Sequence, residues 1–129
     1  MDKITTSTSY FFKTTLLLLI FLSEISCSSI SMVAIKNNTD ETILFHGDFE
    51  HKPNASYNMD FTLKPGENNL WEYELGSLEE NILDKGLKKI TLKNERGCTI
   101  VLERDAIEKM AKKQGPWVIN INRDVMKCK

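Results

Sequence analysis

Apolar and polar residues alternate along most of this chain after residue 30. The clearest stretch is residues 57–63, where the odd positions are apolar and the even positions are polar. A period of two predicts strands that bury one face and expose the other to water. We therefore expect strands over residues 32–36, 42–46, 57–63, 71–75, 87–93, 98–103 and 117–121.

Turn-forming residues separate these segments. At residues 64–67 the sequence is Lys-Pro-Gly-Glu, in which Pro65 presets φ at the second position and Gly66 accepts the positive φ that follows. Residues 94–97 join two predicted strands as a hairpin. Residues 47–56 are predicted to form a polar loop.

Two segments favour helix. Ser77 and Glu80 form a capping-box pair, which predicts a short inserted helix near residues 78–83. Asp105 and Glu108 form a second pair and predict a longer helix over residues 105–113. The last turn of this helix is expected to hold two lysines, at positions 112 and 113, where positive charge complements the helix dipole.

Seven short strands with turn signals between them predict a mainly β fold. We expect a single antiparallel β-sandwich of about seven strands with one short inserted helix. The aliphatic-x-Pro-Gly-Glu turn at residues 63–67 is similar to a turn that recurs in immunoglobulin-like sandwiches. This five-residue resemblance implies an immunoglobulin-like arrangement, and a transthyretin-like one is left open beside it.

The first thirty residues have the layout of a secretory signal. Lys3 and Lys13 precede an apolar run at residues 16–22, and small residues follow at 26–29. The run is shorter than the roughly 20 residues that a membrane-spanning helix needs. We expect a signal peptide over residues 1–27, an exported protein, and one β-sandwich domain over residues 28–129.

Three cysteines bear on the fate of the exported chain. Cys98 and Cys128 are predicted to form a disulfide, with two separate thiols as the alternative. Cys27 follows a small residue after the apolar run, as in bacterial lipoprotein signals, and is the lipidation candidate. However, Glu24 stands where such signals usually carry an aliphatic residue. The alternative is cleavage after Ser28 or Ser29, which removes Cys27 and leaves no membrane contact.

Charge is distributed unevenly along the mature chain. Residues 28–81 hold three lysines and ten carboxylates, whereas residues 82–129 hold twelve lysines and arginines and six carboxylates. Attraction between two halves of one domain explains this pattern, and a dedicated basic binding face is the alternative. Trp117 is the one aromatic residue in the basic half, so we expect no nucleic-acid partner.

The densest group of chemically active side chains lies at residues 46–51. His46, Asp48, Glu50 and His51 are types that bind divalent metals, although their spacing matches no standard zinc arrangement. A solvated loop is the plainer interpretation. The sequence has no Gly-rich phosphate loop, serine elbow or helical His-Glu pair, so we expect neither an enzyme nor a cofactor.

Export, small size and the lack of a catalytic motif favour a binding or assembly module. We expect it to contact another protein of the envelope or the exterior, for example as an accessory lipoprotein of a secretion machine. The alternative is a secreted inhibitor or immunity protein that blocks an enzyme with the predicted loop, where Phe49, His51 and Pro53 are the candidate contacts. Residues 37–39 and 54–56 also match the acceptor sequence for N-glycosylation.

Overall fold

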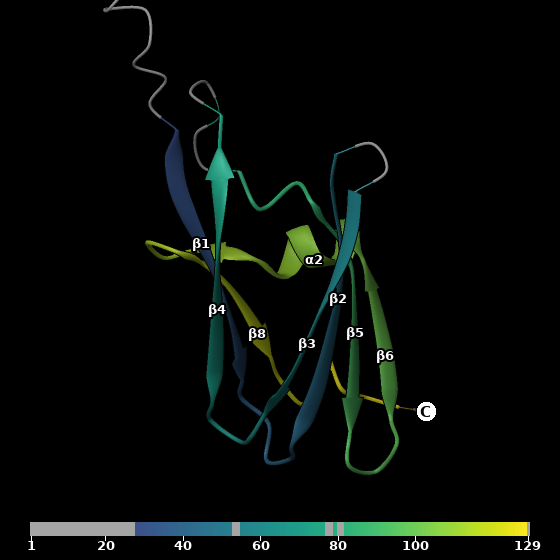
Figure 1. Cartoon of the computed structure of the whole chain (residues 1–129). Coiled ribbons are helices and arrows are strands. Elements are labelled where there is room, and N and C mark those ends of the chain that lie inside the picture. The colour runs from purple at the N-terminus through teal and green to yellow at the C-terminus, as the bar shows by residue number, and fades with distance from the viewer. Residues whose placement is uncertain (1–27, 53–54, 77–78, 80–81, 129) are drawn as a thin grey trace, which may run out of the picture.

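The computed structural model describes residues 28–52, 55–76, 79 and 82–128. These residues form two sheets of four strands each and one short helix, α2 (Arg104–Met110) (Figure 1). The strands are β1 (Ser29–Asn37), β2 (Ile43–Lys52), β3 (Ala55–Leu63), β4 (Asn68–Leu75), β5 (Leu87–Asn94), β6 (Thr99–Glu103), β7 (Lys112–Lys113) and β8 (Trp117–Ile121). The predicted mainly β fold is confirmed.

The strand order is β4-β1-β8-β7 in one sheet, here called sheet A, and β3-β2-β5-β6 in the other, sheet B. All neighbours are antiparallel except β1 and β8, which pair in parallel from Val33 opposite Trp117 to Asn37 opposite Ile121. The pairing is therefore mainly antiparallel, as expected, with this one parallel pair. Here β1 and β8, the first and last strands, lie side by side in the middle of sheet A.

The core lies between the two sheets. Val33 and Ile35 of β1, Ile90 and Leu92 of β5, and Ile119 of β8 are fully buried. Their spacing of two along each strand is the alternation expected from the sequence. The turn at residues 64–67 also matches expectation, because Gly66 has φ of +79°.

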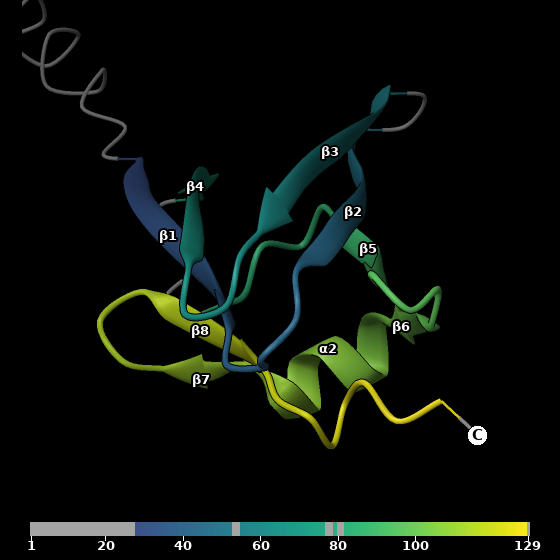
Figure 2. The same ribbon diagram turned by 90° about the horizontal axis from the view of Figure 1, so that it is seen from below.

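Helix α2 closes one side of the sandwich. Viewed along the strands in Figure 2, it lies between the edges formed by β6 and β7, and its Ile107 is fully buried. The helix is shorter than predicted, because Ala111 is already extended. Lys112 and Lys113 form β7 against β8 instead of a last helical turn, and Lys113 Nζ lies 5.6 Å from the centroid of the Trp117 ring.

Two further sequence expectations need correction or stay open. Residues 47–52 continue β2 rather than forming a loop, since all of them except His51 pair with β3 and residues 47–49 also pair with β5. The predicted helix near residues 78–83 falls partly outside the described residues, and Ile82 and Leu83 are not helical. In the described part of the chain, no helix is long and apolar enough to cross a membrane.

Candidate functional site

The predicted metal ligands lie on two faces of β2. His46, Asp48 and Glu50 alternate toward the outer face of sheet B. After a register shift, His51 instead stacks on the inner-face ring of Tyr57, with 5.5 Å between centroids. Among the described residues, no three His, Cys, Asp or Glu side chains are grouped to hold a metal ion. The four predicted ligands therefore do not converge on one point.

His46 instead belongs to a row of charged side chains across three strands. Its Nδ1 lies 2.6 Å from Asp60 Oδ1 on β3, and its Nε2 lies 3.1 Å from Asp48 Oδ1. Lys89 Nζ on β5 lies 2.9 Å from the other Asp48 oxygen. Hydrogen bonding to Asp60 raises the pKa of His46, and Lys89 lowers the pKa of Asp48. The row links neighbouring strands through cross-strand pairs.

The residues predicted as inhibitor contacts do not form a surface loop. Phe49 is 1% exposed and packs edge-on against Trp71, with 5.7 Å between centroids. His51 is half-exposed, and Pro53 lies outside the described residues. Phe49 is therefore a core residue, because β2 continues through position 49 with its alternation intact.

The predicted disulfide between Cys98 and Cys128 is present. It ties the C-terminal segment to the start of β6, across a sequence separation of 30 residues. Cys27 lies outside the described residues, so its lipidation stays a prediction.

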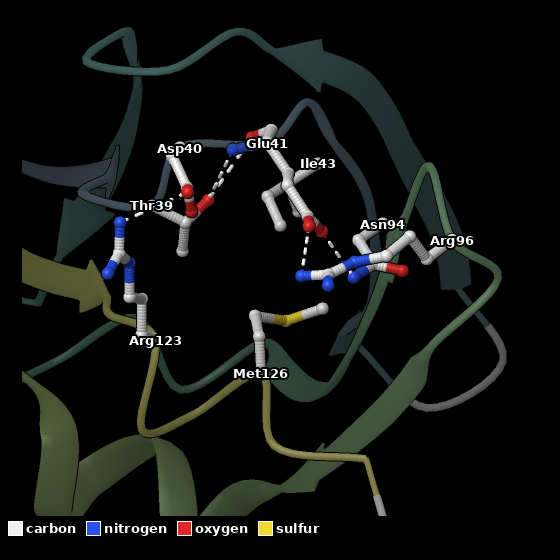
Figure 3. A pocket seen from close by; sticks show the side chains of 8 residues that line it. All are labelled: Thr39, Asp40, Glu41, Ile43, Asn94, Arg96, Arg123 and Met126. Atoms are coloured by element: carbon white, nitrogen blue, oxygen red, sulfur yellow. Dashed lines mark hydrogen bonds and ion pairs between the residues drawn. The ribbon is translucent and has the colours of Figure 1, made fainter.

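A pocket of about 230 Å³ lies beside this C-terminal segment (Figure 3). Its walls carry two ion pairs, Asp40 with Arg123 and Glu41 with Arg96. Asn94 Nδ2 also donates to Glu41, at 2.5 Å. Each arginine thus faces a carboxylate from the β1–β2 turn, so the fixed charges are matched within the pocket. We interpret the pocket as a place where ion pairs hold the β1–β2 turn against the β5–β6 turn and the C-terminal segment, rather than as a ligand site.

The opposite side of the sandwich is open, because the two sheets are offset. Trp71 of β4 packs against Phe45 and Phe49 of β2, at centroid distances of 6.1 and 5.7 Å. Strand β4 therefore lies over β2, and β3 extends one strand beyond it. Figure 2 shows β3 and β4 as separate edges on the side away from α2.

The inner face of β3 is incompletely covered as a result. Tyr57 is 44% exposed, and Met59 and Phe61 are partly exposed. Their partners on β2 are buried: Tyr57 stacks on Phe49 at 4.8 Å and Phe61 on Phe45 at 4.3 Å. We call β3, β4 and these three side chains the open flank.

The outer side of β4 adds acidic character to the open flank. Leu70, Glu72 and Glu74 point away from the core and are exposed. Neither β3 nor β4 contains a lysine or an arginine. Within the described residues, no strand pairs with the outer edge of either one.

Sequence reasoning missed the open flank. Alternation in residues 57–63 correctly identified one apolar face, but only Leu63 on that face is fully buried. The offset between the sheets has no signal in the period of a single strand. The isolated Leu70, on the same side of its strand as two glutamates, was the available hint.

Comparison with known proteins assigns this chain to no family. No protein-family model, curated protein or solved structure matches it.

Proposed function

We propose that this chain is an exported, non-catalytic binding module that contacts another protein through the open flank. The observation that carries the proposal is the half-exposed inner face of β3, where Tyr57, Met59 and Phe61 face no strand of sheet A. Exposed aromatic side chains next to unpaired strand edges are features of interaction sites, since monomeric proteins otherwise cover or charge such edges.

Export is part of the proposal. The disulfide between Cys98 and Cys128 is compatible with an oxidising compartment, where such bonds persist. A leader over residues 1–27 agrees with that location. Acylation of Cys27 would make the module an accessory lipoprotein, for example of a secretion machine, and cleavage after it would make the module soluble in the periplasm or outside the cell. The immunoglobulin-like or transthyretin-like type of the sandwich stays a prediction on which the proposal does not depend.

An inhibitor or immunity protein is the same kind of module with an enzyme as its partner. The polar loop that suggested this role is a strand as far as residue 52, and Phe49 is buried. An inhibitory contact would therefore be made at the open flank. Metal binding gains no support from the positions of His46 and His51.

Site-specific photo-cross-linking tests the proposal. The photoreactive residue p-benzoylphenylalanine in place of Tyr57 projects from the open flank, and the same residue in place of Thr62 projects from the outer face of the same strand. In the exported fraction of cells that produce the protein, we expect a discrete protein adduct from position 57. Position 62 is the matched control and should give none. Adducts at neither position, or equal adducts at both, would contradict the proposal.

A further inference from the structure

We infer, on the basis of the proposed function, that the open flank binds an extended segment of the partner as a fifth strand on the outer edge of β4. The side chains of this segment would alternate between apolar residues that point inward and basic residues that point outward. The inference follows from the offset of the sheets, the alternation in β4 and the charges on its outer side.

The offset selects β4 over β3 as the edge that accepts the strand. Because β4 lies over β2, the next position in sheet A lies over β3. A strand added there would cover Tyr57, Met59 and Phe61 from the opposite sheet. A strand added to β3 would extend sheet B instead and leave those side chains exposed.

The alternation in β4 fixes which side chains of the added strand point inward. Residues paired across two strands share a face, so the positions beside Trp71 and Tyr73 point toward the core. These positions meet the exposed side chains of β3. They favour apolar or aromatic residues, as in other recognition by strand addition.

The outward positions of the added strand meet an acidic surface. Glu72 and Glu74 are exposed on β4, and no lysine or arginine lies in either strand of the flank. Opposite charges on facing positions stabilise a strand pair, and like charges destabilise it. Lysine or arginine therefore suits the positions beside Glu72 and Glu74.

The same charges disfavour a second copy of this chain as the occupant. Pairing of β4 with β4 of another copy would place the outward glutamates of the two strands on one face. Such like-charge neighbours oppose self-association at low salt. A basic segment of a different protein has the complementary charge.

Three eight-residue peptides, each fluorescently labelled, test the inference on the disulfide-bonded protein. In the first peptide lysine alternates with valine and isoleucine, in the second glutamate replaces each lysine, and the third has the composition of the first with its lysines grouped together. Fluorescence anisotropy should show at least tenfold tighter binding of the first peptide than of the other two. Its affinity should fall as salt increases.

Charge reversal identifies the binding edge. The double variant Glu72→Lys with Glu74→Lys should reverse the preference and bind the glutamate peptide more tightly than the lysine peptide. The double variant Glu95→Lys with Glu103→Lys has the same change in charge, in the β5–β6 turn and on the edge strand β6, and should keep the original preference. Circular dichroism checks that both variants are folded.

Hydrogen exchange locates the bound lysine peptide. We expect slower exchange of the amides of β4 (Asn68–Leu75), whereas slower exchange on β6 alone would overturn the inference. Affinities of the lysine and glutamate peptides within twofold of each other, or a dimer of the protein that forms through β4, would also overturn it. These failures are distinct from failure of the proposed function. If position 57 gives a cross-link but the protein does not prefer the lysine peptide, the binding role is supported and only the inference of a basic added strand is rejected.

Discussion

The side chain of Asn37 gives the sharpest test of how the closed end of this protein is held together. It is fully buried, and its Nδ2 donates to the backbone oxygens of Leu63 at 2.9 Å and Glu41 at 2.7 Å. Its Oδ1 accepts from the backbone N–H and the hydroxyl of Thr39, at 3.0 and 2.7 Å. One amide thus joins the end of β1, the β1–β2 turn and the end of β3.

Replacing this amide, in Asn37→Ala, leaves buried backbone groups without partners. The Leu63 oxygen and the Thr39 N–H lose their bonds to the side chain, whereas the Glu41 oxygen can accept from the Thr39 hydroxyl, whose one proton no longer goes to Asn37 Oδ1. An unsatisfied buried group costs about 1–3 kcal/mol, so two of them predict a loss of about 2–6 kcal/mol. A domain of this size has only about 5–15 kcal/mol of stability, so this loss is large.

Urea unfolding followed by tryptophan fluorescence measures this loss. Asn38→Ala is the matched control, because the exposed Asn38 side chain donates only to Asn120 and Asn122 at the surface. We expect less than about 1 kcal/mol from the control, as is usual for surface changes. A loss below about 1 kcal/mol for Asn37→Ala, or equal losses for both variants, would refute the role assigned to the buried amide.

Three other expectations follow from local geometry. Replacing both cysteines of the disulfide with serine should lower the free energy of unfolding by about 3–4 kcal/mol in urea, as expected for a loop of 30 residues, and an unchanged midpoint would contradict this. An NMR titration should give His46 a pKa above 6.5 that falls in the Asp60→Asn variant, and an unshifted pKa would argue against the contact with Asp60. Because the pKa of His46 is raised in the folded state, the stability from this contact is present below about pH 6.5 and is lost as the pH rises through the folded pKa. Gly86→Ala places a Cβ 2.6 Å from the His51 ring and should lower the free energy of unfolding by about 1–3 kcal/mol, measured by thermal unfolding. Gly76→Ala is the control, because a Cβ there meets nothing nearer than 3.7 Å, and equal melting temperatures for the two variants would contradict the close contact.

Local patterns predicted most strands because alternation is a property of consecutive residues. The hairpin of β5 and β6 appears as expected, with Ile90 and Leu92 buried. Prediction failed where a partner strand decides the outcome. Residues 47–52 are polar enough to be taken for a loop, but pairing with β3, and with β5 as far as Phe49, makes them strand. Lys112 and Lys113 similarly pair with β8 instead of ending a helix.

The uneven charge along the sequence now has a structural explanation. Besides the short-range pair of Glu79 with Lys85, three ion pairs join the acidic first half to the basic second half, with carboxylates from the β1–β2 turn and β2. The pairs are Asp48 with Lys89, Glu41 with Arg96 and Asp40 with Arg123. This geometry agrees with attraction between intermingled halves. Glu72 and Glu74, by contrast, lie on the outer face of an edge strand, which is why the open flank keeps an acidic surface.

The candidate site could not be predicted because it depends on how two sheets are displaced relative to each other. The sequence placed Tyr57, Met59 and Phe61 on an apolar face, and that part is correct. Whether a strand of the opposite sheet covers this face is set by which aromatic side chains meet across the core. The contact of Trp71 with Phe45 and Phe49, far apart in sequence, decides it.

Hydroxyl-radical footprinting with mass spectrometry tests the binding role of the open flank most directly. The labelling of Tyr57 is compared between the purified protein and the same protein in its exported fraction, with the exposed Val101 of β6 as the internal reference. If a partner occupies the open flank, labelling of Tyr57 falls several-fold in the exported fraction while labelling of Val101 is unchanged. Equal labelling of Tyr57 in the two preparations would contradict the proposed binding role.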